Sequence, residues 1–247
     1  MLKDKRCWFL LLSTLLLFFL SSCSSNKDNI DEIATLFANR LLYNTDLDEY
    51  KEKFSDSKRF NERSKEVEED LEKNFATVFE PISGKLSQSE REDISRSLID
   101  KVRETTSYTY TLDEQSKGEL KVTYHIKGFD YARLVAMMMA KLLDNQDNID
   151  IGSVNAKHLV TTAYYESLEQ SMSIIEPISI NIYFKKDDDK KWLINNKKTD
   201  GTDIQNLLFV FMTGKVHDED YEKSMLEEIN QIVAREKEKD NKTSSPN

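Results

Sequence analysis

The sequence predicts an α+β fold, with a curved antiparallel sheet of about four strands packed on helices, an N-terminal helical segment and a C-terminal helix. Apolar residues recur at helical spacing as far as about residue 104, and from Thr106 they alternate with polar ones. A helix, strand, strand order then follows a second time. We expect one domain over residues 29–240, divided into a helical part (29–104), a sheet with helices (105–213) and a C-terminal helix (214–240).

The first part of the domain has helical patterns. From roughly Asn29, the residues Ile30, Ile33, Phe37 and Leu41 lie on one face. A second apolar face runs from Phe60 to Phe79, with acidic and basic residues opposite, and predicts a solvated amphipathic helix. These two patterns predict helices that precede any strand.

A third helix is predicted by a capping signal. Ser87 is followed three residues later by Glu90, which is the spacing of a capping box, and apolar residues continue the pattern to about Glu104. This helix should lead directly into the sheet.

Two hairpins are predicted from residues that alternate in polarity. Residues 106–112 and 120–126 alternate on either side of a turn at Ser116 to Gly118. Ile178 to Phe184 alternates again, and after a turn at residues 187–189 the chain returns at Trp192. Because one face of each strand is polar, helices should cover only the other face of the sheet.

Helical patterns also occupy the second half of the domain. Phe129 to Leu143 and Asn155 to Met172 are predicted helices, and a last one begins near Tyr221 and ends at about residue 240. The run from Asp203 to Met212 is mostly apolar, and its pattern does not distinguish a helix from a strand. Residues 241–247 should form a disordered tail.

The N-terminus resembles a lipoprotein signal peptide. Basic residues precede an uncharged apolar run from Trp8 to Leu20, which is too short to span a bilayer. Leu20-Ser21-Ser22-Cys23 then resembles a lipobox, so we expect cleavage between Ser22 and Cys23 after removal of residues 1–22. A lipid-modified Cys23, carrying diacylglycerol and palmitate-type acyl chains, would bind the bilayer outside the cell, and residues 23–28 would form the tether.

Charge and cysteine content limit the possible partners. The formal net charge is −10, and loss of the signal peptide lowers it to about −12. Phosphate backbones repel such a chain, so we expect no nucleic acid partner. Cys7 lies within the signal peptide, and Cys23 is the other cysteine, so no internal disulfide is expected.

Two short motifs resemble a family of lipoproteins. A strand that ends in Ile-Lys-Gly-Phe-Asp-Tyr (Ile126 to Tyr131), and a hairpin that closes on Lys-Lys-Trp-Leu-Ile (Lys190 to Ile194), look like an uncharacterised domain family of Gram-positive bacterial lipoproteins. The layout is also similar to the cystatin-like and NTF2-like superfamily. The resemblance implies a surface lipoprotein with a cleft-forming sheet, and it assigns a role to no residue.

The sequence contains no motif for catalysis, a metal or a cofactor. The histidines, His125, His158 and His217, have no second histidine or cysteine at ligand spacing. The loop from Asp144 to Gly152 fails the EF-hand pattern, and single glycines form no phosphate loop. We therefore expect a protein without enzymatic activity, metal or cofactor.

Four residues are candidates for ligand binding because they should lie on the polar face of the sheet: Lys121, Thr123, His125 and Tyr183. They favour a module that binds a peptide, an envelope component or a partner protein. Two alternatives stay open. The leader could be processed to a hydrophobic pheromone peptide ending at Ser22, or two carboxylates could form an envelope hydrolase.

Overall fold

The computed structural model describes residues 30–243, apart from 59–61, 63–64, 67–68, 70–72, 117, 146–148 and 200. It confirms the α+β class and an open four-stranded antiparallel sheet with the order β1-β2-β3-β4. The predicted signal peptide, Cys23 and the tether lie outside the described residues. The expected disorder of 244–247 also falls outside them.

The sheet is built from two hairpins. Its strands are β1 (Ser107–Ser116), β2 (Glu119–Lys127), β3 (Ile178–Lys186) and β4 (Trp192–Ile194). β2 and β3 are joined through helices and pair antiparallel, so that Thr123 lies opposite Thr111 on one side and Asn181 on the other. The predicted strands and their alternation are confirmed.

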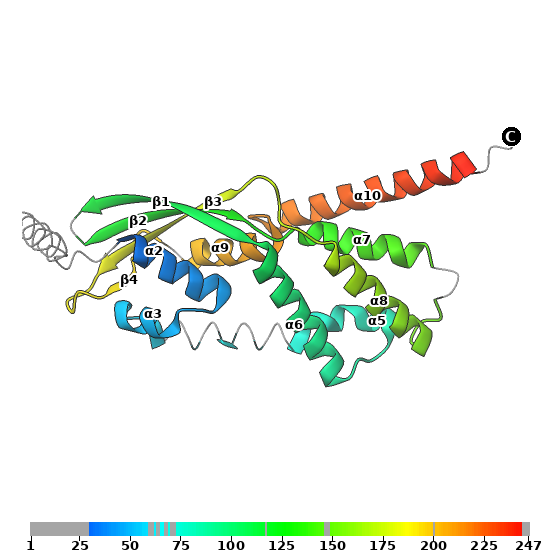
Figure 1. Ribbon diagram of the computed structural model, residues 1–247, viewed down its shortest axis with the longest axis horizontal. Coiled ribbons are helices and arrows are strands. Elements are labelled where there is room, and N and C mark those ends of the chain that lie inside the picture. Colours follow the sequence, from blue (N-terminus) through cyan, green and yellow to red (C-terminus); the bar gives the residue numbers. More distant parts are fainter. Residues whose placement is uncertain are drawn as a thin grey trace, which may run out of the picture.

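Helices cover one face of the sheet. α2 (Ile30–Ala38), α3 (Leu47–Lys53) and α9 (Gly201–Thr213) lie below the sheet in Figure 1, and no described helix lies over the other face. On the covered face Val122, Tyr124 and Ile126 are fully buried. The ring of Phe37 from α2 meets Phe184 edge to face at 4.9 Å, which places the core between these two layers.

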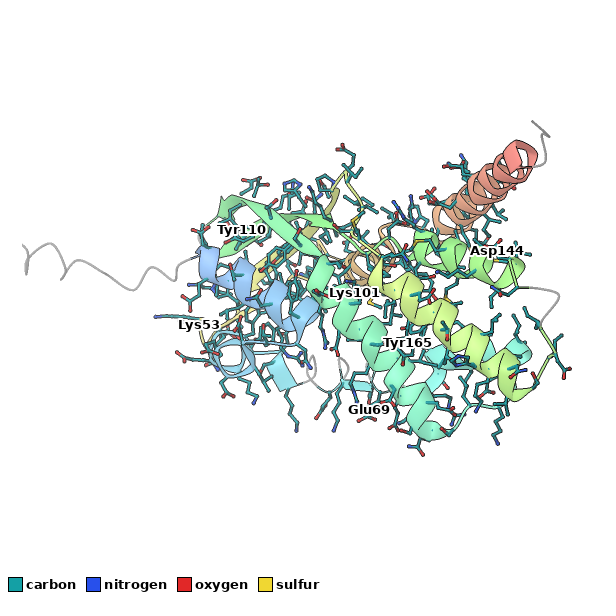
Figure 2. The ribbon with its side chains drawn as sticks, turned by 45° about the vertical axis from the view of Figure 1, so that its right-hand side comes forward. Lys53, Glu69, Lys101, Tyr110, Asp144 and Tyr165 are labelled. Atoms are coloured by element: carbon teal, nitrogen blue, oxygen red, sulfur yellow. The ribbon has the colours of Figure 1, made fainter. Side chains whose placement is uncertain are left out.

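Tyrosine hydroxyls from the sheet hold α2 in place. The Tyr124 hydroxyl donates to the Ala34 carbonyl at 2.8 Å, and the Tyr110 hydroxyl donates to the Asp31 carbonyl at 3.2 Å. Figure 2 shows Tyr110 on the sheet beside α2. Burial raises the pKa of Tyr124 well above its usual value, so its hydroxyl keeps the proton that it donates. Tyr124 is fully buried, and Tyr108 and Tyr110 are half-buried.

A buried polar group lies where α2 continues. The chain widens into the π-helix η1 (Asn39–Tyr43), and Arg40 within it is only 4% exposed. Burial raises the pKa of Tyr50, the Asp56 carboxylate raises it further, and the Arg40 guanidinium lowers it. These three residues thus form a charged cluster beneath the sheet, with opposite charges close together.

The remaining helices form the other end of the molecule (Figure 1). They are η2 (Phe75–Phe79), α5 (Glu80–Ser83), α6 (Gln88–Thr105), α7 (Tyr131–Leu143), α8 (Val154–Glu169) and α10 (Asp218–Thr243). α10 packs on α7, where Tyr221 stacks on Tyr131 with ring centres 5.6 Å apart. The C-terminal half of α10 projects beyond the body.

The predicted capping box is confirmed at the start of α6. The Glu90 amide donates to Ser87 Oγ at 3.3 Å, and the Ser87 amide donates back to the Glu90 carboxylate at 2.7 Å. Lys157 of α8 also contacts this carboxylate at 3.1 Å. The bonds from Ser87, followed by that from Lys157, lower the pKa of Glu90 to about 2.

The predicted helix from Phe60 to Phe79 needs correction at its end. Residues 75–79 form the 3-10 helix η2, and Val78, placed on the apolar face, is 61% exposed. A 3-10 helix has three residues per turn, so the apolar positions of an α-helical pattern rotate out of line. Much of the earlier part of this segment lies outside the described residues.

Two helix ends also differ from the prediction because the chain pairs where a helix was expected. α7 begins at Tyr131 rather than Phe129, since Asp130 caps it and the Phe129 amide donates to the Phe211 carbonyl at 3.0 Å. α8 ends at Glu169 rather than Met172, whose carbonyl accepts from the Asp130 amide at 3.0 Å. These bonds join the sheet to the helical end.

The last two helices differ from their predictions in other ways. The ambiguous run from Asp203 to Met212 is helical, within α9. α10 continues to Thr243, so the predicted end at residue 240 and the start of a disordered tail at 241 are wrong.

Candidate ligand-binding face of the sheet

The four predicted ligand-binding residues lie on the same face of the sheet. Lys121, Thr123 and His125 occupy alternate positions of β2, so their side chains point the same way. Tyr183 of β3 lies directly opposite Lys121. All four side chains are half-buried, on the face that no described helix covers.

Four further residues complete this surface. Thr109 and Thr111 of β1 lie opposite His125 and Thr123, and Ser179 and Asn181 of β3 lie on their other side; all four are exposed. We call the eight together the open face: Thr109, Thr111, Lys121, Thr123, His125, Ser179, Asn181 and Tyr183. Alternation marks each as polar in the sequence, but only the strand pairing shows that they are neighbours.

Side chains of the open face bond across β2 and β3. Thr123 Oγ1 donates to Asn181 Oδ1 at 2.7 Å, and His125 Nδ1 and Ser179 Oγ are 2.7 Å apart. Such pairs form most readily between strand residues that do not exchange backbone bonds, because their side chains are closest. These bonds hold the side chains of Thr123, Asn181, His125 and Ser179 in place.

The backbone around Tyr183 agrees with this register. Its amide donates to Thr199 Oγ1 at 2.6 Å, and its carbonyl accepts from the Asn195 amide at 2.8 Å. Both groups therefore point away from β2. By alternation the backbone groups of Asn181 and Ser179 also point away from β2, which makes their pairs with Thr123 and His125 the ones without backbone bonds.

The end of the open face near the hairpin tips carries lysines. Lys198 contacts the Glu119 carboxylate at 3.1 Å, and this bond, together with the charges of Lys198 and Lys185, lowers the pKa of Glu119. Glu119 lies opposite Lys185, next to the Lys121 and Tyr183 pair. Lys121, Lys185 and Lys198 thus lie near Glu119 at this end, and Asp113 lies opposite Lys121, so both signs of charge occur here.

The contact between His125 and Ser179 has the atoms of a base and a nucleophile. Serine hydrolases also need a third group that orients the histidine and donors for an oxyanion. Among the described residues, neither of these two side chains makes a hydrogen bond to a third group. Both side chains lie on an open sheet surface, so the arrangement supports binding better than it supports acyl transfer.

A pocket lies near the start of α6. It has a volume of about 270 Å³, and the described residues that line it are Lys73, Gln88, Arg91 and Glu92. Among these, Glu92 supplies one carboxylate, whereas a glycosidase uses two. Within the described ranges, no three His, Cys, Asp or Glu side chains gather closely enough to hold a metal ion.

No protein-family model and no curated protein matches the chain. The structure is similar to a crystal structure described as "a putative lipoprotein (ycdA) from Bacillus subtilis", at 17% sequence identity and a TM-score of 0.48. The match covers 72% of this chain and 54% of the other, so this chain spans about half of that protein's length.

The cystatin-like or NTF2-like resemblance stays a prediction.

None of the helices in the described part of the chain is both long and apolar enough to cross a membrane.

Proposed function

We propose that this protein is a membrane-anchored extracytoplasmic lipoprotein that binds a peptide or protein of the cell envelope through the open face, without catalysis. The observation that carries the proposal is the sheet itself. One face is covered by α2, α3 and α9, and the other carries eight polar side chains, of which Thr123 bonds to Asn181 and His125 to Ser179. An uncovered polar face with a lysine, a histidine and a tyrosine suits recognition of a polar partner.

The proposed anchor would keep the domain close to the membrane. A tether from Cys23 to the start of α2 at Ile30 reaches at most about 25 Å. The open face would therefore lie near the membrane surface, within reach of partners in the cell envelope.

The anchor is tested by Cys23→Ala. We expect the variant to leave the membrane fraction and appear in the medium, because the single acylation site is lost. Membrane retention of Cys23→Ala would contradict lipid anchoring, while leaving the binding face untested by that experiment.

The binding face is tested by capture of envelope partners with the full lipoprotein, solubilised from membranes in detergent. The triple variant Lys121→Ala, His125→Ala, Tyr183→Ala should lose partners that the wild type retains. A control with the same kinds of side chain removes Arg96, His158 and Tyr165 of the helical end, which are exposed. The control should capture the wild-type set, and equal loss in both triples would contradict a role for the open face.

A further inference from the structure

β1 forms a long edge of the sheet, and no other segment among the described residues pairs with its outer side. Residues 107–112 contain no charge, proline or glycine, and Asp113 is the first charged residue of the strand. Natural proteins guard such edges with charges, prolines, bulges or covering segments. The register irregularity between Glu114 and Ser116 comes only at the far end.

The opposite edge of the sheet is closed. Phe54 forms a parallel bridge with Trp192 of β4, and the Ser55 amide donates to the Trp192 carbonyl at 3.0 Å. Beyond the end of β4, Asn195 and Thr199 bond both backbone groups of Tyr183. Covering segments thus protect the β4 edge of the sheet, whereas no described segment covers the β1 edge.

Backbone orientation shows what β1 offers. The alternation fixed at Tyr183 makes Thr123 exchange backbone bonds with Thr111, and His125 with Thr109. The backbone groups of the intervening residues, Tyr108, Tyr110 and Leu112, consequently point outward. Among the described residues, no hydrogen bond from another segment reaches those outward amides and carbonyls. The ligand that matches them is another extended polypeptide strand.

We propose that the occupant is β1 of a second copy, paired antiparallel about Tyr110. In this register Thr109 faces Thr111 of the other copy, Tyr108 faces Leu112, and Ser107 faces Asp113. Threonine pairs and aromatic with aliphatic pairs stabilise adjacent strands, and no like charges oppose each other. The edge is therefore self-complementary, as a two-fold interface requires.

The anchor favours this pairing, and in this respect the inference rests on the proposed function. A two-fold axis perpendicular to the sheet keeps α2 of both copies on the same side, so both lipids can enter one membrane. Pairing of seven residues is small beside the roughly 1,600 Å² of a standard interface. Confinement to a membrane raises the effective concentration and offsets that small area. The dimer would present two open faces side by side.

Disulfide trapping in membranes tests the pairing. Thr109 and Thr111 of facing copies should be a pair without backbone bonds, whose Cα atoms lie about 4.5 Å apart, a separation that a disulfide can bridge. Full-length lipoprotein with Thr109→Cys, mixed with a differently tagged Thr111→Cys copy in phosphatidylglycerol and phosphatidylethanolamine vesicles, should give a mixed dimer after mild oxidation.

The controls report register and chance collision. Thr109→Cys alone and Thr111→Cys alone should give far less dimer, because neither residue faces its own copy. Thr123→Cys lies on the same face but inside the sheet, and measures random contact. A mixed pair that links no better than Thr123→Cys would overturn the proposal, as would equal linking of each single variant with itself.

A second variant tests the pairing without cysteines. Ser107→Asp places a carboxylate opposite Asp113 of the other copy at two symmetric positions of the dimer, outside the eight residues of the open face, and both positions are exposed in the monomer. Like charges should raise the surface density needed for half-dimerisation about tenfold, counted by stepwise photobleaching in the same vesicles. An unchanged density would overturn the pairing, whereas envelope capture by the monomeric variant would leave the proposed binding function standing.

Discussion

The two faces of the sheet are ordered by different interactions. On the covered face, buried rings and the Tyr124 hydroxyl hold α2 against the strands. On the open face, Thr123 and His125 are held only by single bonds to neighbouring side chains in contact with solvent. Adjacent residues of one strand thus differ in role, since stability depends on one face while the other is free to serve recognition.

The largest expected effect is that of Tyr124→Ala on the covered face. It removes a fully buried ring and should lower the free energy of unfolding by about 3 to 5 kcal/mol. The adjacent open-face change His125→Ala should cost less than about 1 kcal/mol. Urea unfolding of both variants measures the difference, and equal costs would contradict the division between the faces.

A smaller loss is expected where the covered face meets the helical end. A Cβ atom on Gly128 would lie 1.7 Å from the Val210 carbonyl oxygen, so backbone must move in Gly128→Ala. We expect a cost of about 1 to 3 kcal/mol, typical of overpacking. Gly201→Ala is the matched control, because nothing lies within 4 Å of its added Cβ. Thermal unfolding should separate the two variants, and a neutral Gly128→Ala would show that the junction yields easily.

On the open face, Thr123→Ala should change stability little. It removes the bond to Asn181 at an accessible position, so we expect a cost of about 0.5 to 1 kcal/mol. Thr123→Val keeps the shape and β propensity without the hydroxyl and should behave similarly. Chemical denaturation gives both values, and losses near that of Tyr124→Ala would mean that the open face also supports the fold.

Acid sensitivity gives the smallest expected effect and lies outside the sheet. The Ser87 bonds lower the pKa of Glu90 to about 2, below its ordinary value of 4.5. A lowered pKa stabilises the fold above the ordinary value, and this contribution is lost as the pH falls from about 4.5 toward 2. Glu90→Gln should be less stable than wild type at pH 6, and the gap in urea midpoint should narrow at pH 3. A constant gap would contradict the role of the ionised carboxylate.

Local signals predicted much of this structure. Ser87 and Glu90 form the capping box that their spacing indicated, and period-two alternation separated His125 from Tyr124. Tertiary contacts decided the rest. Phe129 follows a helical pattern but pairs with Phe211 far along the chain, and the apolar run within α9 fits either period.

The candidate site was predictable only in part, for the same reason. Lys121, Thr123 and His125 share a face by alternation within one strand, which the sequence displays. Their contacts with Asn181 and Ser179 depend on the register between β2 and β3, which two intervening helices separate. No periodic pattern specifies such a register.

The most direct test of the open face as a binding surface is photo-crosslinking in living cells. A benzoylphenylalanine replaces Tyr183 in one strain and Tyr165, 41% exposed on the helical end, in another. We predict a discrete envelope adduct from position 183 and none from 165. Adducts from Tyr165 without any from Tyr183 would contradict the assignment of binding to the open face.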